Sequence, residues 1–328
     1  MPVAGLSLSD LWSESIRGYE WPDEAKSSLN CGAGLEFDES RLLKLASGAS
    51  DQGHFVLTFL SSEYLPLGLL WTRFALEAGI RRFAIAAADS ETAAELQGLG
   101  IPFVELHLPQ QLAGLVHYRN RGGFSGKALA LIYSRLRLVK FLIDNGIDVL
   151  CCDIDALIKR NPQPYLGKVS TIAFQRVVYF PKALAKVWGF TACAGVVAYR
   201  ASSAVSALLS RVLAIQQDVS SDQLALNLAL LEKGVQWNLT CDIAGSEQEL
   251  ISAFTANAHR SIEGRIPGST LILEALPATL FWRHNFVPSD PRFNVILHPN
   301  SPKSVEGKLA VFLALLGVDE MQLTTGTS

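Results

Sequence analysis

The residues Val149-Leu150-Cys151-Cys152-Asp153-Ile154-Asp155 form an apolar strand that ends in two carboxylates, one residue apart. Because side chains alternate along a strand, Asp153 and Asp155 point to the same side of the backbone. Two anions this close repel each other, and a hard divalent cation relieves the repulsion. The motif therefore predicts a site for Mn²⁺ or Mg²⁺ at a strand end, where a phosphorylated ligand can bind.

Apolar runs and helical patterns alternate upstream of this strand. Strands are predicted at 54–60, 83–88 and 103–106, and helices at 65–79, 91–98 and 127–145. The apolar runs are continuous, which is typical of strands covered on both faces. This order predicts an α/β protein with a doubly wound, mostly parallel sheet, in which ligands bind at the carboxyl ends of the strands.

The second half of the chain has a different pattern, which predicts a mixed α+β half. Its strands are predicted at 170–175, 192–199, 235–240, 270–274 and 293–298, and its helices at 202–217 and 221–233. No linker rich in Pro or Ser divides the chain. We therefore expect residues 1–50 to be an N-terminal extension packed on the main domain, and residues 51–328 to form a single domain.

The composition limits the classes of function. The 328 residues are 49% hydrophobic and 18% charged, with a formal net charge of -3 and a pI near 6.1. This content supports a sizeable core, and the missing cationic field argues against a nucleic-acid partner. No apolar stretch reaches the ~18–20 residues of a transmembrane segment. The first ten residues lack the pattern of a secretory signal, so we expect a cytoplasmic protein with reduced cysteines.

Further candidate residues lie at strand and helix ends. His298 closes an apolar strand, where an imidazole can complete a carboxylate metal site, and Lys303 follows closely enough to contact a diphosphate. The segment 119–127 combines cations, small residues and a helix start. Such a segment suits anion binding, and it equally suits a flexible turn that ends with Ser125 as N-cap. Arg135, on the following helix, is a further candidate cation.

Two other segments have both a local and a functional interpretation. Asp222 and Gln223 precede an apolar helix, so Asp222 is either an acid of the first helical turn or, with Gln223, a group presented to a polar substrate such as a sugar. Gly195, within the small-residue strand, allows another group to approach the backbone closely.

Together these segments resemble the nucleotide-diphospho-sugar transferase family, glycosyltransferases of the GT-A fold, over most of the chain after residue 54. The resemblance rests on the strand with Thr58, the Asp153-Ile154-Asp155 motif, the Gly195 strand, Ser221-Asp222-Gln223 and His298. It implies a metal-dependent glycosyltransferase with a nucleoside-diphosphate sugar donor, UDP-sugar being expected. The implied acceptor is a hydroxyl of a glycan, protein or small molecule, and the implied stereochemical outcome is retention.

The resemblance also implies individual roles. Asp153, Asp155 and His298 would bind Mn²⁺ or Mg²⁺, which offsets the charge that builds on the leaving diphosphate. Donor contacts would come from both aspartates together with Thr58, Lys127 and Lys303. Asp222 and Gln223 would line the sugar and acceptor side as the catalytic pair.

Two alternative functions fit the same motifs. A catalytically inactive module would bind the nucleotide sugar and the metal without transferring the sugar. Haloacid-dehalogenase-type phosphatases also place an Asp-x-Asp after a strand, with the first carboxylate as nucleophile and the second as acid. Those enzymes usually begin with the motif, whereas here it starts at Asp153. We further expect Asp155 to be an exposed acid whose loss leaves the fold intact.

Overall fold

The computed structural model describes residues 7–23, 25–26, 35–47, 53–115, 120–121, 123–239, 246–288, 290, 292–300, 302 and 304–317. Its α-helices are α1 Leu8–Ile16, α3 Glu39–Ser47, α4 Leu65–Glu77, α5 Ser90–Gly98, α6 Gln110–Ala113, α7 Gly126–Asp144, α8 Lys182–Trp188, α9 Ser203–Gln216, α10 Asp222–Glu232, α11 Glu247–Ala256 and α12 Val305–Leu316. Its strands are β1 Glu36–Phe37, β2 Phe55–Leu60, β3 Phe83–Ala87, β4 Phe103–His107, β5 Val149–Cys152, β6 Leu157–Ile158, β7 Ile172–Val177, β8 Thr191–Tyr199, β9 Gln236–Trp237, β10 Ile262–Arg265, β11 Ile272–Ala275, β12 Phe281–Trp282 and β13 Ile296–Leu297. Short 3₁₀ helices occupy Ser62–Tyr64 and Gln163–Tyr165.

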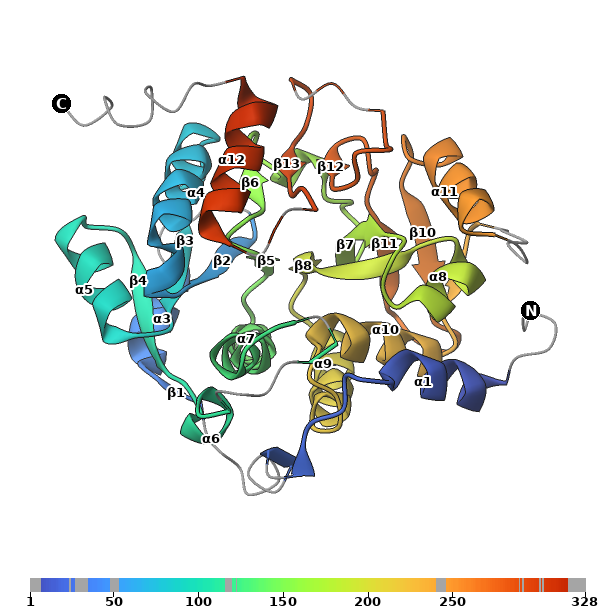
Figure 1. Ribbon diagram of the computed structural model, residues 1–328, viewed down its shortest axis with the longest axis horizontal. Coiled ribbons are helices and arrows are strands. Elements are labelled where there is room, and N and C mark those ends of the chain that lie inside the picture. Colours follow the sequence, from blue (N-terminus) through green and yellow to red (C-terminus); the bar gives the residue numbers. More distant parts are fainter. Residues whose placement is uncertain are drawn as a thin grey trace.

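A ten-stranded mixed sheet crosses the molecule in the order β1-β4-β3-β2-β5-β8-β7-β11-β10-β9 (Figure 1). Strands β4, β3, β2 and β5 pair in parallel, whereas β8 is antiparallel to both β5 and β7. Every residue of β2, β3 and β5 is buried, as expected for strands covered on both faces. The predicted α/β class is confirmed, with a parallel first half and a mixed second half.

Helices cover the sheet from two sides. In Figure 1, α7, α9 and α10 group below the central strands, and α4 and α12 lie above them. The longest of these helices, α7, buries residues at helical spacing, among them Leu129, Leu136, Val139 and Leu142. This packing fixes α7 beneath β5, so that its polar side chains at the cavity end are held in place.

A small second sheet has the strand order β12-β13-β6. It brings β12 and β13, from late in the chain, next to β6, which follows soon after β5. Leu157 pairs with Leu297 in antiparallel register, and Leu297 pairs with Trp282 in parallel register. His298 follows β13 directly, so it lies beside the residues that precede β6. The strand predicted at 293–298 is thus much shorter than expected.

Several elements were not predicted. α1 and α11 both begin with a capping box, formed by Ser7 with Asp10 and by Ser246 with Glu249, and this local signal was present in the sequence. β1 adds to the sheet edge by pairing with β4, and Leu11 of α1 is buried in the main core. Residues before position 50 therefore contribute both a strand and part of the core.

Two further features concern the predicted environment of the protein. Within the ranges described, no helix combines the length and the apolar character needed to cross a membrane. Cys151, Cys152 and Cys193 are buried free thiols. Burial raises the pKa of Cys151 to about 12, so this thiol is neutral and packs as a small apolar group.

Candidate active site

A cavity of about 580 Å³ lies where β2, β3 and β5 end, and it extends across β8. Phe59 and Ser61 line it at the end of β2, Ala88 after β3, and Asp153 and Asp155 after β5. The volume is typical of a site for a small-molecule or cofactor ligand. Its place at the carboxyl ends of parallel strands is the one expected for ligands in open α/β sheets.

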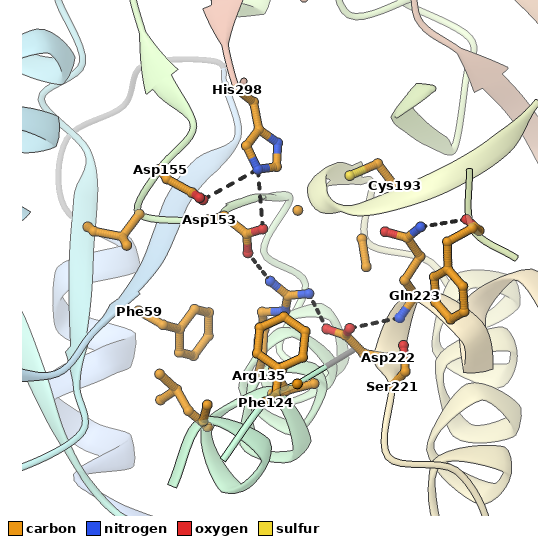
Figure 2. A pocket seen from close by; sticks show the side chains of 18 of the residues that line it. Phe59, Phe124, Arg135, Asp153, Asp155, Cys193, Ser221, Asp222, Gln223 and His298 are labelled. Atoms are coloured by element: carbon orange, nitrogen blue, oxygen red, sulfur yellow. Dashed lines mark hydrogen bonds and ion pairs between the residues drawn. The ribbon is translucent and has the colours of Figure 1, made fainter. Parts of the chain in front are cut away.

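Asp153, Asp155 and His298 converge inside this cavity (Figure 2). The Nε2 atom of His298 lies 3.5 Å from Asp153 Oδ2 and 3.4 Å from Asp155 Oδ1. One potential ligand atom from each residue lies within 4.8 Å of the others. The Asp153 side chain is 34% exposed and that of Asp155 is 14% exposed, so the expectation that Asp155 is an exposed acid was wrong.

Backbone contacts bring these side chains together. The Asp153 N–H donates to the Gly195 carbonyl over 2.6 Å, and the Ala156 N–H donates to the Asp153 carbonyl over 3.0 Å, which closes a turn. Trp71 of α4 holds the turn by donating from Nε1 to the Ala156 carbonyl. A methyl group on residue 195 would overlap the Asp153 carboxylate and the His298 ring, which confirms the predicted close approach at this glycine.

Gln175 of β7 sets the orientation of the His298 ring. Its Nε2 donates to the carbonyls of Phe281 and Trp282, so its Oε1 is left to accept a hydrogen bond of 2.8 Å from His298 Nδ1. His298 Nε2 is then the acceptor nitrogen, which is contacted by Arg283 and lies near both aspartates. This is the tautomer that a metal-binding histidine needs, and such a partner is typical of metal sites.

Replacing Gln175 by Leu is expected to weaken Mn²⁺ binding by about 10–100-fold, because the ring loses the acceptor that fixes its tautomer. Isothermal titration calorimetry measures this affinity. The matched control is Gln216→Leu, since Gln216 is also fully buried but does not line the cavity. Unchanged Mn²⁺ affinity in the Gln175 variant, with His298 still required for binding, would contradict this role.

Each of the three potential ligands is also contacted by a basic side chain. Arg135 contacts Asp153, Lys308 contacts Asp155, and Arg283 contacts His298 Nε2. All three basic residues line the cavity. Burial raises the pKa of Asp155, but contacts with His298 and Lys308 outweigh it and hold that pKa well below its usual range.

Arg135 connects Asp153 to α10. Its guanidinium contacts Asp222, the first residue of α10, as well as Asp153, and its side chain is only 9% exposed. Burial lowers the pKa of Arg135, but the two carboxylates raise it well above its usual value. For Asp222, burial raises the pKa, although Arg135 acts in the opposite direction. Asp222 is therefore both an acid of the first helical turn and part of the cavity wall.

Gln223 lies on the same wall as Asp222. Its backbone N–H donates to Asp222 Oδ1 over 2.7 Å, and its side-chain Nε2 donates to the Phe180 carbonyl over 2.7 Å. Figure 2 shows the amide oxygen on the opposite side of the group, towards the cavity. This oxygen is therefore placed to accept a hydrogen bond from a ligand hydroxyl.

The structure brings some of the predicted donor contacts to the cavity and leaves others away from it. Lys127 lines the cavity and forms an ion pair of 3.1 Å with Asp89. Partial burial raises the pKa of Asp89, but hydrogen bonds from Thr92 and Ser62 and the Lys127 ammonium lower it to about 2. Thr58 is fully buried in β2 and does not line the cavity.

Two of the basic residues predicted to contact phosphate lie outside the described ranges. Lys303 lies outside the described residues, as does Arg119 of the predicted anion-binding segment. Ser125 caps α7 by accepting from the Ala128 N–H over 3.4 Å.

Comparison with known proteins places the chain in a family. A model of the nucleotide-diphospho-sugar transferase family matches residues 78–312. The chain belongs to this family, which confirms the predicted resemblance. A comparison with curated protein sequences finds no match.

Two solved structures show partial likeness. The bifunctional glycosyltransferase WbbM in its apo form is 12% identical, with a TM-score of 0.39, over 56% of this chain and 38% of that one. Mouse xyloside xylosyltransferase 1 in its apo form is 13% identical, with a TM-score of 0.36, over 55% of this chain and 82% of that one. The chain thus spans less than half the length of WbbM.

Gln175, Arg283 and Lys308 are site residues that sequence reasoning missed. A glutamine in the fully buried strand Ile172–Val177 is a usable signal, because buried amides need specific partners. Arg283 and Lys308 have no comparable signal, since each stands in a segment of ordinary polar and apolar residues.

Proposed function

We propose that the protein is a metal-dependent glycosyltransferase that moves a sugar from a nucleoside-diphosphate sugar, with UDP as the expected nucleotide, to an acceptor hydroxyl with retention of configuration. One observation carries the proposal: Asp153, Asp155 and His298 converge in a cavity of a nucleotide-diphospho-sugar transferase family member. Two carboxylates and an imidazole nitrogen fit Mn²⁺ or Mg²⁺. Such an ion, when bound, would stabilise the charge of the leaving diphosphate.

The cavity has two sides, which suit a donor and an acceptor. On the side of β2, β3 and α7 it is lined by Phe59, Tyr64, Phe124 and Lys127, which offer aromatic faces and a cation for a nucleotide. On the side of β7, β8 and α10 it is lined by Tyr19, Val177, Tyr179, Phe180, Gln223 and His284. Because β5 lies between β2 and β8, the aspartates stand between the two sides. We assign the first side to the nucleotide and the second to the acceptor.

The side chains around Asp222 support a particular form of the retaining reaction. Asp222 is held by Arg135 and by the Gln223 N–H, so its carboxylate is neutralised and fixed rather than free to attack. The Gln223 amide oxygen can hold the acceptor hydroxyl on the second side of the cavity. This arrangement favours attack from the same face as the leaving group over a covalent enzyme intermediate.

The test is a screen of nucleoside-diphosphate sugars for transfer and for slow hydrolysis to free sugar, with and without EDTA. We expect at least one donor to be turned over with Mn²⁺, and EDTA to abolish this turnover because the ligands alone cannot neutralise the diphosphate. Readdition of Mn²⁺ should restore it.

The same screen distinguishes the alternative functions. Binding of a nucleotide sugar without turnover of any donor would identify an inactive binding module. Metal-dependent cleavage of phosphomonoesters, without binding of nucleotide sugars, would identify a phosphatase. Turnover that persists in EDTA would contradict the metal dependence.

A further inference from the structure

The three basic side chains around the metal ligands are not held alike. Arg135 contacts two carboxylates, Asp153 and Asp222, and is anchored between α7 and α10. Lys308 reaches Asp155 from the first turn of α12, and Arg283 reaches His298 from the residue after β12. Arg283 contacts the His298 nitrogen that faces the aspartates, and Lys308 contacts Asp155 Oδ2, beside the Oδ1 atom that faces His298. A cation bound by Asp155 and His298 therefore competes with both basic side chains.

The formal charges of the site balance when His298 is counted as the neutral imidazole that metal binding requires. Those of Asp153, Asp155 and Asp222 are then matched by those of Arg135, Arg283 and Lys308. A divalent cation bound alone would leave two excess positive charges beside the largely buried Asp155 and His298, and a nucleotide-sugar diphosphate alone would leave two excess negative charges. Either state is unfavourable at short range, but binding of both restores the balance.

Lys308 and Arg283 can both reach a diphosphate in the same cavity. Lys308 and Arg283 line it together with Asp153 and Asp155. A lysine carries its charge on a flexible stem, and the arginine guanidinium presents several donors that match phosphate oxygens. Once displaced from Asp155 and His298, each would find its new anion close by.

We propose that Lys308 and Arg283 exchange partners during donor binding, from Asp155 and His298 to the diphosphate, so that metal and diphosphate bind synergistically. This inference rests on the proposed function and adds the residues that couple the two ligands. It also adds Lys308 as a diphosphate contact, beside the contact that the family resemblance implies for Lys303. The consequence is that neither Mn²⁺ nor a nucleoside diphosphate binds tightly without the other.

The test compares Lys308→Ala and Arg283→Ala with the unaltered protein by calorimetry, using Mn²⁺ alone, UDP or GDP alone, and each nucleotide with saturating Mn²⁺. In the unaltered protein, Mn²⁺ should raise nucleotide affinity by about 5–150-fold. Each variant should bind Mn²⁺ alone more tightly, because a competing cation is gone. Each should bind the nucleotide with Mn²⁺ at least about tenfold more weakly.

Tighter binding of Mn²⁺ alone combined with weaker nucleotide binding distinguishes the proposed exchange of partners from a structural role. A side chain that merely supports the site would weaken Mn²⁺ and nucleotide binding together, and that result would overturn the proposal. Lys182→Ala, at an exposed ion pair with Glu247, is the matched control and should behave as the unaltered protein. If the unaltered protein binds neither nucleotide with Mn²⁺, the proposed function fails. If it binds one but both variants bind Mn²⁺ no more tightly, only the exchange fails.

Discussion

Asp155→Asn is expected to lower glycosyl transfer by about 1000-fold and to remove measurable Mn²⁺ binding, because it deletes one of two anionic ligands while keeping the volume of the side chain. Asn is the informative substitution, since Asp155 is largely buried between His298 and Lys308. An alanine there would remove packing as well as charge. The amide oxygen of Asn can still accept a hydrogen bond from Lys308, so the fold is kept.

The measurements for this variant are donor turnover, Mn²⁺ affinity and thermal unfolding. Asp144→Asn is the matched control, because Asp144 pairs with Lys140 on the exposed part of α7. It should leave turnover and Mn²⁺ affinity unchanged. An Asp155→Asn variant that is folded and retains more than a tenth of the turnover would disprove the assignment of Asp155 as a ligand.

Arg135→Met is expected to lower the free energy of unfolding by about 3–5 kcal/mol, the largest stability effect at the site, because it leaves buried Asp222 without its cation. Asp153 loses a partner in the same variant, although it is more exposed. Urea denaturation monitored by tryptophan fluorescence gives the free energy. Arg73→Met, at an exposed pair with Glu77, should change it by less than about 1 kcal/mol.

A second substitution identifies the cause of this loss. Asp222→Asn in the Arg135→Met background removes the buried unpaired charge and should recover a substantial part of the lost stability. If the double variant is no more stable than Arg135→Met alone, the destabilisation comes from packing of the arginine stem and not from the ion pair.

Much of the parallel half of the fold could be predicted because its signals are local and long. The continuous apolar runs that became β2, β3 and β5 have the length of whole strands, and helices such as α7 keep a regular spacing over many residues. The two-residue strands β6, β12 and β13 are too short to show any periodicity. Their pairing depends on partners far away in the chain, so it could not be predicted.

The candidate site also contains residues that could be predicted from local sequence and residues that could not. The motif itself indicated that Asp153 and Asp155 share one site, although both lie in the turn after β5 and not within the strand. Family resemblance added His298. Gln175, Arg283 and Lys308 reach the site only through the pairing of β6, β13 and β12 and the docking of α12. The sequence alone does not indicate whether a basic side chain will be solvated or will pair with a carboxylate.

The small sheet β12-β13-β6 has a consequence for how the protein matures on the ribosome. The two aspartates emerge with the parallel half of the fold, but His298 and Lys308 emerge only when nearly all the described residues have been made. A nascent or prematurely terminated copy can therefore build much of the large sheet while holding neither the imidazole nor the lysine. By the proposed function, a copy that ends before residue 298 should therefore be unable to hydrolyse donor sugars.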